Sequence, residues 1–354
     1  MTYKETLFFV GKCLTINHED HNKKIVEDLL KEGTVDWDNV VKLSTEHYVF
    51  PALYCNLKRT DFLHYLPEDL VGYMEHITEL NRERNTQIIE QAKEINELLL
   101  AHNIIPIFLK GTGNLLEGLY EDIAERMVGD IDFLVSDENF TNTVEVILNS
   151  GYEDVSKSDN HFPAEKHYPR LQKETKIAAI EVHREMTTGK FAKTFNFKTI
   201  ENKIFSKDNL SFLHYSDQLK LSIIAKQIND DGRFYNDISL RNAYDVFLIS
   251  QKVDSKKSIE LLDDQIKIPL NNFLSLSKIT LNSNTINFFK NNISEKYSTK
   301  FSLLLDNQNL RKKHHNKWNK RLFIIKRLKI ILKAFYKKDY TIWLLKRIKK
   351  GRQA

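Results

Sequence analysis

Hydrophobic patterning divides the chain into stretches of two kinds. From residue 1 to about residue 103, apolar residues recur at intervals of three and four, the spacing of α-helices that bury one face. The segment Leu66-Pro67-Glu68-Asp69 has the proline and the acids typical of a helix start, and helical spacing then continues to His102. The pattern predicts an N-terminal helical region over residues 1–103, ending in one long helix or two abutting helices.

The pattern changes after residue 103. Short apolar or alternating runs at Ile104–Leu109, Asp130–Val135, His167–Gln172 and Ile177–His183 are typical of strands. Helical spacing separates the first two runs, and a second helical stretch ends at Gly151. Strand–helix–strand–helix followed by a pair of strands predicts a small mixed α/β unit over residues 104–205.

Helical spacing returns in the last part of the chain, over residues 206–310. The predicted fold class is therefore α+β, a small mixed β-sheet domain flanked by N-terminal and C-terminal helical regions. Residues 311–354 form a separate basic amphipathic tail.

Composition excludes several classes of protein. Apolar residues make up 41% of the 354 residues, enough for a real core and too many for a disordered chain. Two cysteines, Cys13 and Cys55, cannot build a disulfide scaffold and fit a reducing cytoplasm. No apolar run suits a secretion signal or a spanning helix, and no glycine-rich loop of the Rossmann or P-loop type is present. A cytoplasmic location is expected, with peripheral attachment at the inner membrane face as an option.

The candidate chemistry lies in three segments of the α/β unit. Asp130 and Asp132 are two residues apart on a strand, so both carboxylates lie on one face, roughly 7 Å apart by Cα. Glu181 is a lone acid in an apolar strand, costly to bury unless it is paired or metal-bound. Carboxylates grouped in this way suit Mg²⁺. His183 shares the face of Glu181, as a metal-site contact or as a hydrogen bonder behind it.

The third segment is the turn at Lys110-Gly111-Thr112, between a strand and a helix. A helix N-terminus with a glycine, a hydroxyl and a lysine can seat phosphate groups, although an ordinary strand–helix turn has the same appearance.

Three stretches together resemble the DNA polymerase β superfamily of nucleotidyltransferases: Leu109–Thr112, Arg126–Val135 and Ile180–His183. More closely, the chain is similar to a bacterial family of uncharacterised nucleotidyltransferases within that superfamily, over about residues 30–250. The interval from Thr112 to Asp130 is longer than in the minimal superfamily motif. Thr112 stands where many relatives have serine, and the hydroxyl is retained.

The resemblance implies a metal-dependent enzyme that moves a nucleoside monophosphate from an NTP to a hydroxyl acceptor and releases pyrophosphate. Asp130, Asp132 and Glu181 would hold two Mg²⁺ ions, with Mn²⁺ as an alternative, and Glu181 could accept the hydroxyl proton. Gly111 and Thr112 would seat the β- and γ-phosphates. The residues expected to neutralise phosphate charge are Lys110, Arg126 and Lys226, although Lys226 also suits a solvated helix face.

Several alternatives stay open at this point. The acceptor could be a small molecule, a surface-glycan precursor, an RNA end or a protein side chain. The rival class is a non-catalytic binding or regulatory module with the same fold, including the toxin–antitoxin type. Arg241 and Asp245 are predicted to form a structural pair on one helix, and Tyr120 and Phe162 are candidates for stacking on the base.

Charge sets the tail apart from the rest of the chain. Residues 311–354 contain 17 Lys and Arg and one acid, a net charge of 17 − 1 = +16, while residues 1–310 carry 36 − 47 = −11. Ile324, Leu328, Ile331 and Phe335 share one helical arc, and lysines occupy the opposite arc. This pattern predicts packing on the protein's own body, docking on an anionic membrane surface, or binding of nucleic acid or another polyanion.

Overall fold

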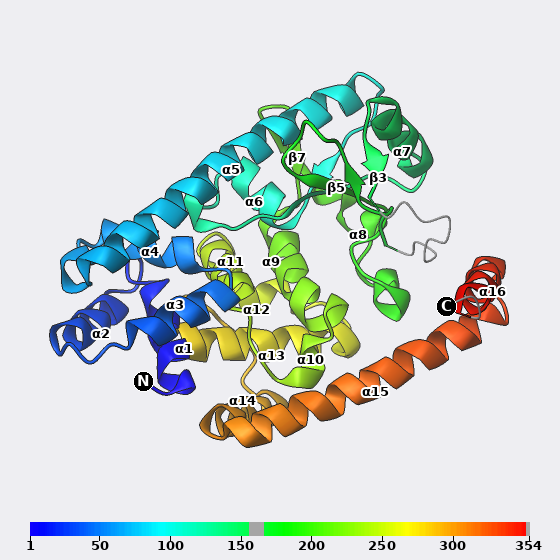
Figure 1. Cartoon of the computed structure of the whole chain (residues 1–354). Helices are drawn as coiled ribbons and strands as arrows, with labels where there is room; N and C mark the ends of the chain where they lie inside the picture. Colours follow the sequence, from blue (N-terminus) through cyan, green and yellow to red (C-terminus); the bar gives the residue numbers. More distant parts are fainter. Residues whose placement is uncertain (156–165, 352–354) are drawn as a thin grey trace.

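The structure, a computed structural model, describes residues 1–155 and 166–351 (Figure 1). Helices gather at both ends of the chain, and one seven-stranded mixed sheet is built from the middle. The predicted α+β fold class is confirmed. The candidate base-stacking residue Phe162 and the last three residues of the tail lie outside the described residues.

The N-terminal region consists of five helices. They are α1 (Tyr3–Cys13), α2 (Asp20–Lys31), α3 (Trp37–Glu46), α4 (Phe50–Arg59) and α5 (Glu68–Leu100). The predicted long helix is a single element, α5, with Pro67 at its N-cap and two acids in its first turn. At about 1.5 Å per residue its 33 residues span roughly 50 Å, so α5 runs the length of the sheet domain and beyond it (Figure 1).

The sheet has the strand order β3-β4-β5-β2-β1-β7-β6. Its strands are β1 (Ile107–Phe108), β2 (Asp130–Leu134), β3 (Glu153–Asp154), β4 (Leu171–Gln172), β5 (Ala179–His183), β6 (Phe205–Lys207) and β7 (Leu210–Phe212). The two longest strands, β2 and β5, are parallel neighbours at the centre.

The observed strands are shorter than the predicted apolar runs. Of Ile104–Leu109 only two residues pair, because Pro106 has no N–H to donate to a neighbouring strand. Of His167–Gln172 the last two residues form β4, and a bridge joins His167 to His183. The hairpin β6–β7 was not predicted, and it carries the sheet on to Phe212 through parallel pairing with β1. The four-part division of the chain stays a prediction.

Helix α5 holds the sheet domain through buried side-chain amides. Asn81 and Asn85 donate to the backbone carbonyls of Ala124 and Arg126 in the loop before β2, at 2.7 and 2.8 Å. Gln91 donates to the carbonyl of Ala178 and accepts from its N–H, just before β5. Because a buried backbone group without a partner is costly, these amides fix where both central strands begin.

The C-terminal region packs back on the N-terminal helices. Its helices are α9 (Tyr215–Ile224), α10 (Gly232–Tyr235), α11 (Leu240–Ser250), α12 (Ser255–Ser258), α13 (Asp264–Leu281) and α14 (Asn292–Asp306). Buried apolar residues from both regions and from the sheet belong to one hydrophobic core, which extends from Leu7 to Leu305. Within it, Gly11 of α1 touches the backbone of Thr280 in α13.

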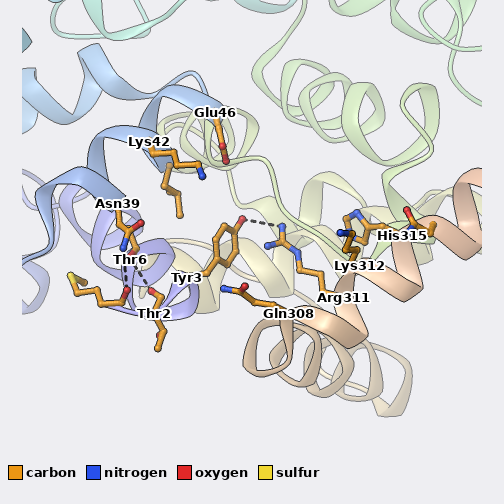
Figure 2. Close-up of a pocket in the computed structure, with 13 residues that line it drawn as sticks. Thr2, Tyr3, Thr6, Asn39, Lys42, Glu46, Gln308, Arg311, Lys312 and His315 are labelled. Carbon is orange, nitrogen blue, oxygen red and sulfur yellow. Dashed lines mark hydrogen bonds between the residues drawn. The ribbon is translucent and has the colours of Figure 1, made fainter.

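The tail forms two helices, α15 (Gln308–Ala334) and α16 (Lys338–Gly351). The first turns of α15 border a pocket of about 570 Å³ between α1 and α3. There the Arg311 guanidinium donates to the Tyr3 hydroxyl at 3.0 Å (Figure 2). This pocket contains none of the candidate site residues named above. In the described part of the chain, no helix combines the length and the apolar character needed to cross a membrane.

The contact at Gly11 generates a prediction about stability. A Cβ atom at Gly11 would lie 2.3 Å from the Thr280 carbonyl oxygen, so Gly11→Ala must push α1 away from α13. We expect this change to lower the free energy of unfolding by about 1–3 kcal/mol in urea denaturation. Gly72→Ala is the matched control, because nothing lies within 4 Å of that position in α5. Alanine there should stabilise the helix by up to about 1 kcal/mol. Equal effects at both positions would contradict the packing of α1 on α13.

Candidate active site

The pairing of β2 with β5 brings the candidate acids together. The parallel register places Asp132 directly beside Glu181, and Leu134 beside His183. Because side chains alternate along a strand, Asp130, Asp132, Glu181 and His183 share one face of the sheet. The intervening residues point to the other face and are fully buried: Ile131, Phe133, Ile180 and Val182. The apolar face fixes the register, and the register brings the acids together.

Three of these residues could hold a metal ion. Asp132, Glu181 and His183 each offer one ligand atom, and these atoms all lie within 4.8 Å of one another. The Nε2–H of His183 donates to Oδ1 of Asp132 at 2.8 Å, and Nε2 lies 3.4 Å from Oε2 of Glu181. This hydrogen bond fits the expectation that His183 positions the acids. To act as a metal ligand instead, His183 would have to use a ring nitrogen that carries no proton.

Neighbouring cationic and hydrogen-bonding groups keep Asp132 and Glu181 ionised. Burial opposes ionisation of Asp132, but the Lys110 ammonium and the His183 hydrogen bond outweigh it and hold the pKa of that carboxyl well below its usual range. Burial also opposes ionisation of Glu181, yet its contact with His183 lowers its pKa overall. Two ionised carboxylates side by side are the hard oxygen donors that Mg²⁺ and Mn²⁺ prefer.

Arg170 binds the remaining acid, and the sequence did not single it out. Leu171 of β4 pairs with Ile180 of β5, so the preceding residue, Arg170, lies beside Glu181. Its Nε donates to Oε1 of Glu181 at 3.3 Å, and its Nη2 pairs with Oδ2 of Asp130. Burial raises the pKa of Asp130, and Arg170 partly offsets that effect. Arg170 thus bridges two acids, and Asp130 lies outside the group of three potential metal ligands.

Lys110 reaches the acids from the turn after β1. Its Nζ lies 2.5 Å from Oδ1 of Asp132 and 4.0 Å from Oε2 of Glu181. Burial disfavours the ammonium, but Asp132 more than compensates and raises the pKa of Lys110. Lys110 has φ +52°, the left-handed region, which typically costs a non-glycine residue about 1–3 kcal/mol. The backbone is thus held in an unfavourable conformation where the lysine meets the acids.

The rest of the turn is packed tightly against the sheet. Thr112 is buried, and its hydroxyl donates to the backbone carbonyl of Asp130 at 2.8 Å, so it holds β2 in place. A Cβ at Gly113 would lie 2.6 Å from the Phe108 carbonyl oxygen, and one at Gly111 would lie 3.0 Å from Val128. These glycines let helix α6 (Lys110–Glu117) begin directly against β1, with its first N–H groups lacking partners inside the helix.

Arg126 is not brought to the acids. Its guanidinium is buried behind Gly111, where Nε binds both carboxylate oxygens of Asp245, at 3.1 and 3.2 Å. Asp245 also accepts from the Tyr120 hydroxyl at 2.7 Å. Arg126 and Tyr120 thus already have a partner in Asp245, and the phosphate contact expected of Arg126 and the base stacking considered for Tyr120 stay predictions. Asp245 pairs with Arg126 rather than with Arg241, whose guanidinium lies over the Tyr48 ring.

Lys226 lies in a π-helical turn, Ala225–Asn229, that follows α9. Its Nζ is 3.3 Å from Oδ1 of Asp237. It also belongs to the charge surroundings of Asp230, whose pKa is raised by burial and drawn down by Lys226, Lys166 and Lys110. Lys226 is thus near the cluster but is already paired. In the same turn the buried Gln227 amide has no hydrogen-bond partner among the described residues.

The sequence of residues 33–279 matches the family described as uncharacterised nucleotidyltransferases. This match covers more than half of the chain and contains every residue of the cluster. The chain is a member of that nucleotidyltransferase family. No curated protein and no solved structure gives a significant match.

Sequence reasoning did not single out three charged residues that lie in or near this acid cluster: Lys166, Arg170 and Asp230. The alternation of residues 167–172 indicated a strand, but only the pairing of β4 with β5 decides which residue faces Glu181. Asp230 follows a turn whose π-helical geometry leaves no signature in the amino-acid pattern.

The three potential ligands generate a prediction about metal binding. We expect Mn²⁺ to bind the wild-type nucleotidyltransferase, and Asp132→Asn to weaken that binding by at least about tenfold, because one ionised donor is lost. Titration of free Mn²⁺ by electron paramagnetic resonance measures this directly.

Asp137→Asn is the matched control for metal binding. Asp137 follows the end of β2, and its carboxylate is 71% exposed in a pair with Arg184. Mn²⁺ affinity should be unchanged in this variant. Failure of the wild type to bind Mn²⁺, or equal weakening by both substitutions, would contradict a metal site at Asp132.

The pair of Arg126 with Asp245 generates a prediction about stability. Asp245→Asn leaves the Arg126 guanidinium buried without its carboxylate, which should cost about 3–5 kcal/mol in chemical denaturation. Asp306→Asn changes the same chemistry in the exposed pair with Lys4 and should cost less than about 1 kcal/mol. A small effect at both positions would show that Arg126 does not depend on Asp245.

Proposed function

We propose that this protein is a metal-dependent nucleotidyltransferase of the DNA polymerase β-like superfamily. It transfers a nucleoside monophosphate from an NTP to a hydroxyl group of an acceptor and releases pyrophosphate. The observation that carries the proposal is the register of β2 with β5, which puts Asp132 beside Glu181 with Asp130 on the same face. The glycine turn and Lys110 adjoin these acids.

The acids fit a divalent metal. Ligand atoms of Asp132, Glu181 and His183 lie close enough to share one ion, and Asp130 extends the same face of the sheet. Asp130, Asp132 and Glu181 would hold two Mg²⁺ or Mn²⁺ ions, which supply charge stabilisation at the phosphate and acidify the acceptor hydroxyl. In the ligand-free protein, Lys110 and Arg170 are the cations that balance the negative charge of these acids.

Cationic groups around the acids suit a triphosphate. Lys110 and the first backbone N–H groups of α6, at Gly111 and Thr112, would bind the β- and γ-phosphates. Lys166 and Arg170 enter from the segment beside β5, and Arg170 offers the planar fork that binds phosphate oxygens well. Lys226 would contribute once it exchanges Asp237 for phosphate.

The transfer is an in-line displacement. The acceptor oxygen forms a bond to the α-phosphorus while the bond to the β-phosphate oxygen breaks, and pyrophosphate leaves with that oxygen. The hydroxyl proton passes to Glu181, whose lowered pKa keeps it ionised near neutral pH. His183 holds Asp132 in place during this step.

One observation favours a rival function. Lys110 and Arg170 already pair with the three acids, as they would in a nucleotide-binding module that performs no transfer. Such a module would bind NTP and regulate a partner protein. A toxin–antitoxin protein is one example of this rival class. Transfer and binding therefore have to be measured separately.

We place the reaction in the cytoplasm, where NTPs and Mg²⁺ are abundant. Cys13 and Cys55 are both buried free thiols, which agrees with a reducing compartment. The acceptor class stays open between a small molecule, a glycan precursor, an RNA end and a protein side chain.

Incubation with Mg²⁺, cell extract and each of the four NTPs, labelled at the α-phosphate, tests the proposal. Label should move to an acceptor, and Asp130→Asn/Asp132→Asn should slow transfer by more than about a hundredfold because charge stabilisation of several kcal/mol is lost. Asp137→Asn should transfer label at the wild-type rate. NTP binding without transfer would favour the rival module. Absence of both NTP binding and transfer would refute both functions.

A further inference from the structure

The first part of α15 packs on the helical body. The Trp318 ring lies 4.7 Å from the Phe234 ring, and Leu322 is buried. Lys326 Nζ lies 2.8 Å from Oδ2 of Asp231. Beyond it α15 continues away from the helical body and carries α16 at its far end (Figure 1).

Large apolar side chains are exposed on this outer part of the tail. Leu328 is 54% exposed, Leu332 60% and Phe335 82%, at the spacing of one helix face. Eleven of the twenty-five large apolar side chains that the described residues expose lie between residues 323 and 348. They are Phe323, Ile324, Ile325, Leu328, Ile331, Leu332, Phe335, Tyr336, Ile342, Leu345 and Ile348. Exposed apolar side chains gathered in this number on neighbouring turns are typical of an interaction site.

The same segment carries the basic charge of the chain. The net charge of residues 311–354 is +16, and lysines and arginines alternate with the exposed apolar residues along both helices. We propose that the outer tail, residues 327–349, docks on the surface of an anionic lipid bilayer. Its apolar side chains enter the boundary between headgroups and acyl chains, and its basic side chains bind lipid phosphates.

The structure favours a bilayer over the other possible partners. Packing on the protein's own body would bury Leu328 and Leu332, which are exposed in the structure of the whole chain. A second copy would bring +16 against +16, which opposes association through this surface. Nucleic acid would use the lysines but gives no role to a row of large aliphatic side chains. An anionic bilayer offers phosphate groups to the basic side chains and, beneath them, an apolar region for the exposed apolar side chains.

The bilayer proposal does not depend on nucleotidyl transfer, so its test needs no activity. The purified full chain is sedimented with phosphatidylcholine vesicles and with vesicles containing about one third phosphatidylglycerol, at low and high salt. We expect at least about tenfold tighter binding to the anionic vesicles, weakened by salt. Absence of binding to the anionic vesicles at low salt would overturn the proposal.

Variants separate the apolar contribution from the charge. Leu328→Glu/Leu332→Glu should abolish sedimentation with the vesicles, whereas Leu261→Glu, at a 98% exposed position on the body, should leave it unchanged. Lys329→Gln/Lys338→Gln should lower the preference for anionic vesicles several-fold, and Lys23→Gln/Lys24→Gln in α2 should not. All four variants change exposed side chains, and melting curves establish that each is folded.

Two further outcomes would assign the surface to another partner. If the wild type is a dimer by light scattering and Leu328→Glu/Leu332→Glu makes it a monomer without any vesicle binding, the partner is a second copy. If the chain binds duplex RNA tightly and does not sediment with anionic vesicles, the partner is a nucleic acid. Either result would overturn the bilayer proposal.

Discussion

Repulsion among three carboxylates is the constraint around which the sheet domain is arranged. Asp130, Asp132 and Glu181 lie on one face of two adjoining strands, and like charges at such distances are destabilising unless cations balance them. The protein supplies two such cations from separate segments, Lys110 from the turn after β1 and Arg170 from the segment before β4. Lys110 adopts a left-handed backbone conformation in that turn. Acids grouped at this cost are candidates for a functional role, which is why the cluster is the candidate site.

The acids stay together because the other face of the strands and helix α5 leave the backbone little freedom. Ile131, Phe133, Ile180 and Val182 are fully buried on the opposite face, so a slip of one residue would bury the acids and expose the core. Buried amides of α5 bind backbone groups just ahead of both strands. The interval between Thr112 and Asp130, longer than in the minimal motif, contains the turn that these amides hold. Arg126 and Asp245 then connect that turn to α11.

The body and the tail follow different rules of folding. In the body, apolar residues from the N-terminal helices, the sheet and the C-terminal helices share one core, so each region needs the others. In the outer tail, many large apolar side chains are exposed, among them Leu328, Leu332 and Phe335. An exposed apolar surface of this kind is typical of an interaction site.

The sequence by itself determined the classes of element, the candidate acids and the division of charge. Period-two and period-3.6 patterns are local, so they predicted α5, β2 and β5 and the shared face of Asp130 and Asp132. Only the tertiary structure decided which residues meet. Strand pairing set Asp132 beside Glu181 and brought in Arg170, and a buried ion pair with Asp245 took Arg126 away from the acids. Pairing between strands and burial of charges depend on contacts across many tens of residues, and no local pattern records them. The amphipathic tail was evident from its spacing, but its exposed apolar face became evident only when the body was in place and left it uncovered.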